Sequence, residues 1–199
     1  MVTKQPLHVL IAGGGLSGLA LAQGLLKDGH SCEVFERDAD LSRKRGYYLH
    51  MNADGGEALR RCLPGDLFEL YAETSRQTPA RRESIVLDDQ VNVLSSQPHL
   101  GPPNEGPRPH TGVDRRTLRQ ILLARLGDSF RPGRTAVSYE EQPGGVRLTL
   151  GDGSTAEGDV LVGADGIRSA IRGQCLTAVP VIDAGIRGLG GVRPVPADS

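Results

Sequence analysis

Residues 7–36, LHVLIAGGGLSGLALAQGLLKDGHSCEVFE, decide the fold of this 199-residue chain. Residues 7–12 form a short apolar run, which is typical of a strand buried on both faces of a parallel sheet. Glycines follow at once, then a helical pattern, and residues 31–35 predict a second strand that ends beside Glu36. Strand, glycine turn, helix and second strand within about 30 residues predict the opening unit of a dinucleotide-binding α/β fold.

The three glycines at Gly-x-Gly-x-x-Gly spacing meet separate steric demands. Gly13 allows a tight turn, Gly15 lets the backbone approach a diphosphate, and Gly18 lets the helix pack closely on the strand. The helix start, which contains Leu16 and Ser17, offers free N–H groups and the positive end of the helix dipole to that diphosphate. We therefore expect these residues to bind the diphosphate of an adenine dinucleotide.

Glu36 follows the second strand at the carboxyl edge of the predicted sheet. Its distance from the glycines agrees with the roughly 20-residue offset of the dinucleotide fingerprint. A carboxylate at this place accepts hydrogen bonds from both ribose hydroxyls and repels a 2′-phosphate.

The glycine segment has two other interpretations. The chain has 27 glycines, so a flexible glycine loop is one alternative, but the ordered neighbouring elements favour a nucleotide site. Gly15-Leu16-Ser17-Gly18 also resembles a nucleophile elbow. Because Leu19 occupies the place of its final glycine, Ser17 is predicted to be a helix-start residue.

Composition excludes several classes of function. The chain has 23 Lys and Arg against 24 Asp and Glu, so no general positive field attracts nucleic acid or an anionic membrane. No run approaches the ~18 apolar residues of a membrane span. Three widely separated cysteines argue for reduced thiols, and the histidines show no metal-ligand spacing. We expect a cytoplasmic protein with no metal site; its oligomeric state is open.

The remaining sequence predicts a mixed α/β chain. Helices are predicted at residues 52–62, 66–74 and 113–126, the last capped by Asp114 and ended by Gly127. Residues 85–94 predict a hairpin, and residues 97–109 a loop rich in proline and glycine. Residues 136–150 predict a small antiparallel β-meander. An apolar strand at residues 159–163 then returns to the parallel sheet and ends in Ala164-Asp165-Gly166.

Three segments together carry a family resemblance: the opening unit, Asp114-Arg115-x-x-Leu118, and GDVLVGADGIRSAIR at residues 158–172. With them the chain resembles the FAD-dependent aromatic hydroxylases, the para-hydroxybenzoate hydroxylase-like monooxygenases, over essentially its whole length. The resemblance implies a Rossmann-like FAD/NAD(P)-binding α/β fold with a small β-meander. Residues 1–175 would form the FAD-binding domain, with an excursion at 76–109, and residues 176–199 would begin an incomplete substrate domain.

The resemblance also implies roles for basic residues. Glu36 would hold the adenosine ribose and Arg37 would lie beside the adenine, while Arg45 and Arg115 would approach the FAD phosphates or ribityl chain. From charge pattern alone, Arg45 and Arg115 are equally well explained as solvated surface arginines.

Asp165 and Gly166 would lie at the pyrophosphate and ribityl side, with Arg168 nearby. A carboxylate-glycine turn after an apolar strand is also where open α/β sheets bind ligands, although it could be a plain turn. The cofactor-binding residues predicted in all are Gly13, Gly15, Leu16, Ser17, Gly18, Glu36, Arg37, Arg45, Arg115, Asp165 and Gly166.

The chemistry that the resemblance implies is hydroxylation of a small aromatic or polyketide-like molecule, with NADPH or NADH reducing the FAD. No catalytic acid or base is predicted, because the flavin carries that chemistry. The family's second Gly-Asp motif does not occur before Ser199. The chain is therefore expected to be an incomplete half, or a non-catalytic dinucleotide-binding module that needs a partner chain. A simple NAD-dependent dehydrogenase is disfavoured by the β-meander.

Overall fold

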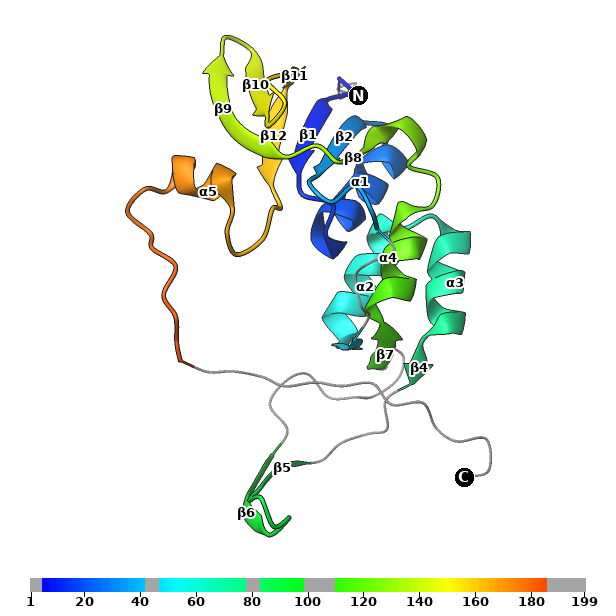
Figure 1. The fold of residues 1–199 in the computed structure, drawn as a ribbon. Helices are drawn as coiled ribbons and strands as arrows, with labels where there is room; N and C mark the ends of the chain where they lie inside the picture. Colours follow the sequence, from blue (N-terminus) through cyan, green and yellow to red (C-terminus); the bar gives the residue numbers. More distant parts are fainter. Residues whose placement is uncertain (1–4, 42–46, 78–82, 99–109, 186–199) are drawn as a thin grey trace.

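A parallel four-stranded sheet forms the centre of the molecule (Figure 1). The computed structural model describes residues 5–41, 47–77, 83–98 and 110–185. The sheet has the order β12-β1-β2-β8, with neighbouring strands parallel. Its strands are β1 (His8–Ala12), β2 (Ser31–Glu36), β8 (Phe130–Pro132) and β12 (Val160–Gly163). The predicted parallel sheet is confirmed, and β8 is a strand that the sequence analysis did not predict.

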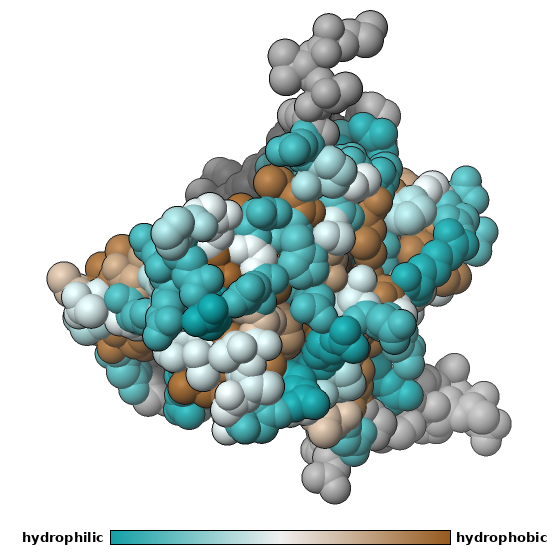
Figure 2. Space-filling model, turned by 90° about the horizontal axis from the view of Figure 1, so that it is seen from above, coloured by the Kyte–Doolittle hydropathy of each residue, from teal (hydrophilic) through white to brown (hydrophobic). Residues whose placement is uncertain are grey.

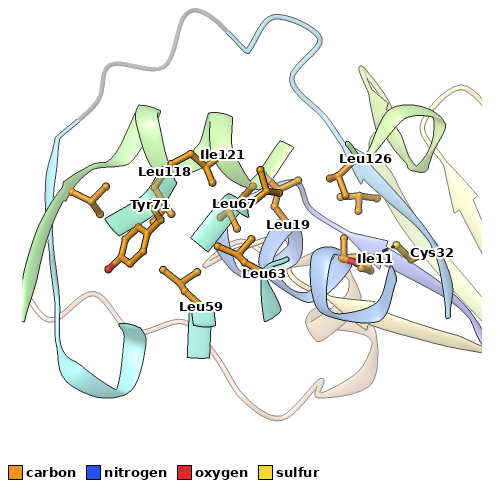
Figure 3. Packing of buried hydrophobic residues seen from close by; sticks show 14 of the residues in the cluster. Ile11, Leu19, Cys32, Leu59, Leu63, Leu67, Tyr71, Leu118, Ile121 and Leu126 are labelled. Atoms are coloured by element: carbon orange, nitrogen blue, oxygen red, sulfur yellow. Dashed lines mark hydrogen bonds between the residues drawn. The ribbon is translucent and has the colours of Figure 1, made fainter. Parts of the chain in front are cut away.

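Four helices cover one face of this sheet (Figure 1). They are α1 (Leu16–Lys27), α2 (Ala53–Cys62), α3 (Gly65–Thr74) and α4 (Arg115–Leu123). Alternate residues of the central strands, such as Val9, Ile11 and Val34, pack into this helical layer. Figure 3 shows how the apolar side chains pack there, with Leu19 of α1 near Leu63 and Leu67.

A β-meander covers the opposite face of the sheet. It consists of β9 (Ala136–Gln142), β10 (Gly145–Leu150) and β11 (Thr155–Gly158), all antiparallel. The other alternate residues of the central strands, Leu10, Ala12 and Phe35, pack against Leu148 and its neighbours in the meander. The short helix α5 (Ala170–Cys175) follows β12 and contributes Ile171 to this second core. The central strands are thus buried on both faces, as their continuous apolar runs predict.

Two small antiparallel sheets lie beyond the helical layer. One has the order β3-β7-β4, from β3 (Tyr48–Met51), β4 (Arg76–Gln77) and β7 (Thr111–Asp114). The other is the hairpin of β5 (Glu83–Leu87) and β6 (Val93–Pro98), which stands away from the body of the molecule (Figure 1). The hairpin was predicted, whereas β3, β4 and β7 were not. Residues 176–185 contain no helix or strand.

The predicted helix at residues 113–126 needs correction at both ends. Val113 belongs to β7, and α4 begins at Arg115 because the Asp114 carboxylate caps it, accepting from the N–H groups of Arg116 and Thr117. The helix ends at Leu123, and Arg125 has a φ of 65°. Gly127 starts the 3-10 turn η1 (Gly127–Ser129) and does not end α4.

The surface seen from above the meander is mainly hydrophilic, with apolar residues in small separate groups (Figure 2). Among the residues that the structure describes, no helix is both long and apolar enough to cross a membrane.

Candidate functional site

A pocket of about 240 Å³ opens where the carboxyl ends of β1, β2 and β12 meet. Four charged side chains line it: Glu36, Arg37, Asp165 and Arg168. The start of β9 completes the wall with Thr135 and Ala136. This edge of an open parallel sheet is the place where such sheets bind ligands.

Gly13 and Gly18 of the fingerprint have the steric roles that their spacing predicts. Gly13 has a φ of +111°, and a Cβ there would lie 2.3 Å from the carbonyl oxygen of Ala164. A Cβ on Gly18 would lie 2.1 Å from the Gly13 carbonyl oxygen, so only glycine lets α1 approach the loop. A Cβ on Gly15 would meet nothing within 4 Å. Gly15 therefore borders open space at the pocket, where a ligand can come close to the protein backbone.

The N-terminus of α1 differs from those of the other helices around it, three of which have a side-chain cap and one of which, α3, has no such cap but carries Asp66 in its first turn. The first N–H groups of α2, α4 and α5 are capped by the side chains of Asn52, Asp114 and Ser169. By contrast, α1 begins at Gly15 with no side-chain cap and no acidic residue in its first turn. Free N–H groups at a helix start favour an anion, so this end of the pocket suits a phosphate group.

Glu36 ends β2 with its carboxylate almost completely buried and paired. Its Oε2 atom lies 3.1 Å from Nη2 of Arg119, and both side chains are about 5% exposed. Its Oε1 atom accepts a hydrogen bond of 3.0 Å from the N–H of Asp38. Both carboxylate oxygens therefore have a fixed protein donor, which sets the orientation of the group at the pocket.

Gly14, between two glycines of the fingerprint, joins the same arrangement. Its carbonyl oxygen accepts hydrogen bonds from Nε and Nη2 of Arg119, at 3.2 and 3.0 Å. A Cβ at Gly14 would lie 2.8 Å from the ring of Phe130 and 2.9 Å from Cβ of Glu36. The glycine loop is therefore pressed directly against the carboxylate and leaves no room for a side chain.

The Asp165-Gly166 turn forms the opposite wall of the pocket. Oδ2 of Asp165 accepts a 2.8 Å hydrogen bond from the N–H of Ala170, at the start of α5. Its Oδ1 atom is buried and has no hydrogen-bond partner among the described residues. Gly166 has a φ of +85°, and Arg172 donates to its carbonyl oxygen at 3.3 Å. The turn is thus held from both sides and keeps one acceptor unsatisfied.

The structure brings most, but not all, of the predicted site residues together. Six of them line the pocket: Gly13, Gly15, Glu36, Arg37, Asp165 and Gly166. Leu16, Ser17 and Gly18 occupy the first turn of α1, directly after Gly15. Ser17 is therefore a helix-start residue, as predicted.

The two other predicted arginines are placed differently. Arg115 is not among the residues that line this pocket. Its guanidinium carbon lies 5.6 Å from the centre of the Tyr47 ring, and its backbone N–H donates to the Tyr47 carbonyl. Arg45 lies outside the described residues.

The sequence analysis missed Arg119 altogether. The signal was available: Arg119 shares a face of α4 with Leu118 and Leu122, where apolar residues are expected. An arginine within an apolar stripe is almost never buried unless it is paired. Thr135 and Ala136 were not predicted either, because the sequence at the start of a strand does not show whether those residues line a pocket.

None of the three cysteines lines the pocket. Burial raises the pKa of the Cys32 thiol, with a further contribution from Glu33, and Cys32 packs within the hydrophobic core. Within the described ranges, no group of three or more His, Cys, Asp or Glu residues is arranged to hold a metal ion.

Comparison with known proteins identifies relatives over most of the chain. Residues 11–49 match the model of the NAD(P)-binding Rossmann-like domain. The chain is 34% identical over 193 residues to the dual O-methyltransferase/FAD-dependent monooxygenase elcB of Phaeosphaeria nodorum, covering 93% of this chain and 20% of that protein. It is 33% identical to the FAD-dependent monooxygenase thnD of Trichoderma harzianum, covering 85% of this chain and 41% of that protein. The chain thus spans less than half the length of these curated relatives.

Solved structures show the same fold. A protein of Photorhabdus luminescens subsp. laumondii, assigned as an FAD-containing monooxygenase, superposes with a TM-score of 0.73 at 33% identity, covering 87% of this chain and 43% of that one. HpxO of Klebsiella pneumoniae, solved as a complex with FAD, superposes with a TM-score of 0.65 at 24% identity, covering 88% of this chain and 44% of that one. The second likeness concerns the fold alone.

Proposed function

We propose, from the premise that this chain belongs to the FAD-dependent monooxygenase family and spans its N-terminal portion, that its pocket binds the ADP part of FAD. The observation that carries the proposal is the joining of three unlike groups at one sheet edge. These are the uncapped start of α1 at Gly15, the oriented carboxylate of Glu36 and the Asp165-Gly166 turn. Diphosphate, ribose and the ribityl side of FAD are the matching ligand groups.

The residues present fit this cofactor in charge and in space. Gly15 borders open space, and the first turn of α1 carries no acid that would repel a diphosphate. Arg37 and Arg168 line the pocket and add positive charge to its wall. Arg37 is proposed to lie beside the adenine. The unsatisfied Oδ1 atom of Asp165 offers an acceptor. Arg45 and Arg115 remain proposed contacts to the phosphates or ribityl chain.

The wider function that we propose is NAD(P)H-dependent hydroxylation of a small aromatic or polyketide-like molecule. Bound FAD supplies the redox chemistry, and this portion of the protein orients the cofactor and excludes water from it. Residues 1–175 form the proposed FAD-binding domain, with residues 76–109 reaching toward the substrate domain that begins at residue 176. The alternative is a dinucleotide-binding module without catalysis that needs a partner chain, which is favoured by the fact that the chain spans less than half the length of its curated relatives.

Purified residues 1–199 separate these proposals. ADP and FAD are titrated by calorimetry, and the visible spectrum is recorded after addition of FAD and gel filtration. Oxidation of NADPH and NADH is followed by the loss of their near-ultraviolet absorbance. Retained flavin with nicotinamide oxidation supports the monooxygenase. ADP binding without retained flavin supports the binding module. No binding of either ligand rejects the nucleotide site.

A further inference from the structure

A buried arginine lies directly behind the proposed ribose site without lining it. Arg119 is 4% exposed, and its guanidinium reaches two separate elements: the carboxylate of Glu36 at the end of β2 and the carbonyl of Gly14 in the glycine loop. One planar fork therefore connects α4, β2 and the loop between β1 and α1.

We propose that Arg119 is a positioning residue for the nucleotide, which holds the Glu36 carboxylate in the orientation that receives the ribose hydroxyls. This inference rests on the proposed function of the pocket. Glu36 lines the pocket and Arg119 does not, so Arg119 acts only through the carboxylate and the glycine loop.

The acceptor count of the carboxylate supports this role. An ionised carboxylate has about four lone-pair positions on its two oxygens. Arg119 occupies one position on Oε2, and the N–H of Asp38 occupies one on Oε1. The described part of the chain supplies no further donor to these oxygens, so one position is left on each, which matches the two neighbouring hydroxyls of a ribose.

A purely structural role for the pair is the competing explanation. Burying two opposite charges is a poor way to gain stability, because desolvation offsets their attraction and apolar residues often serve as well. Glu36 also lines the pocket, and Arg119 holds the glycine loop that is proposed to approach the diphosphate. Nη1 of Arg119 is buried without a hydrogen-bond partner among the described residues, a cost that stability alone does not explain.

A ligand that lacks the ribose hydroxyls separates the two explanations. Dissociation constants for ADP and for 2′,3′-dideoxy-ADP are measured by calorimetry on residues 1–199, and their ratio reports the carboxylate-ribose contact. We expect wild type to prefer ADP by about tenfold or more, since hydrogen bonds to a charged group are strong. Arg119→Gln and Glu36→Gln should each reduce the preference to about threefold or less, chiefly by weakening ADP binding.

Three results would overturn the inference. In the first, Arg119→Gln leaves both dissociation constants unchanged; in the second, it weakens both ligands equally, which is the structural outcome. If wild type binds neither ligand, the proposed function fails and this inference fails with it. Arg60→Gln, which removes an exposed contact to Glu57 on α2, is the matched control and should leave both constants unchanged.

A second variant keeps the test decisive if Arg119→Gln does not fold in a thermal unfolding assay. Arg119→Lys keeps the positive charge beside Glu36 but lacks the planar fork that also holds Gly14. We expect it to fold and to lower the ADP preference by about threefold. A folded Arg119→Lys protein with the full wild-type preference would contradict the positioning role.

Discussion

The edge of the parallel sheet and the β5–β6 hairpin differ in how tightly they are packed. At the sheet edge, Gly13, Gly14 and Gly18 leave no space for even one extra carbon atom. In the hairpin, Ile85, Val93 and other apolar side chains are more than half exposed, and the two strands pair only with each other. An isolated hairpin is marginally stable in water, so rigidity is concentrated where a ligand would bind.

Gly18→Ala should break the tightly packed region and has the largest expected effect. The new Cβ would lie 2.1 Å from the Gly13 carbonyl, which cannot move without displacing the loop. We expect the free energy of unfolding to fall by about 3 kcal/mol, measured in urea. Gly56→Ala in α2 is the control, because its Cβ meets nothing within 4 Å and alanine favours a helix. Equal stability of the two variants would contradict the packing argument.

Gly15→Val separates binding from stability in the same loop. No atom lies within 4 Å of the added Cβ, so the free energy of unfolding should fall by only about 1 kcal/mol, the cost of valine in place of glycine at a helix N-cap. The side chain would fill the space proposed for the diphosphate, and we expect the affinity for ADP to fall by about 100-fold or more. Calorimetry measures the affinity and urea unfolding the stability. Unchanged ADP affinity would reject this placement of the ligand.

Val91→Gly tests the loose region by the opposite change. Val91 lies in the hairpin turn with a φ of 67°, which is unfavourable for a β-branched residue. We expect glycine to stabilise the hairpin locally by up to about 1 kcal/mol, seen as slower amide hydrogen exchange in residues 83–98. Val93→Gly in β6 is the control and should speed exchange, since glycine weakens a strand. Faster exchange in Val91→Gly would show that the turn carries no strain.

Asp88 gives the smallest expected effect, in the same turn. Hydrogen bonds from the side chain and backbone N–H of Asn92, and from the N–H of Gln90, lower the pKa of its carboxyl group. A lowered pKa means that the contribution to hairpin stability is present above the ordinary aspartate pKa of about 4 and is lost as pH falls through the lower value.

An NMR titration of the Asp88 carboxyl carbon measures that pKa directly. Asn92→Ala should raise it toward the ordinary aspartate value, because the largest stabilising contact is removed. The same pKa in wild type and variant would show that the turn does not form in solution.

The parallel sheet and the glycine loop were predictable because each depends on local sequence. The apolar run of β1 and the spacing of Gly13, Gly15 and Gly18 can each be recognised within about ten neighbouring positions. The strand β8, three residues long, has no periodicity of its own and exists because β2 offers it an edge. Short strands of this kind depend on tertiary context, so the pattern of the sequence does not reveal them.

The candidate site likewise contains one residue that the local sequence predicts and one that it does not. Glu36 was predicted from its position after a strand, and it does line the pocket. Its partner Arg119 is 83 residues away in the sequence, and no local pattern connects the two. The end of α4 was misplaced for a related reason, since Leu126 continues the apolar pattern after the backbone has left the helix at Leu123.

The position of β1 between β2 and β12 has a consequence for synthesis of the chain on the ribosome. This strand pairs on one side with residues made shortly after it, but its other neighbour, residues 160–163, is made much later. The contact between Gly13 and Ala164 therefore closes late. A nascent chain must keep one apolar strand edge unpaired until then, a period in which chaperones that recognise extended apolar segments have their opportunity to bind.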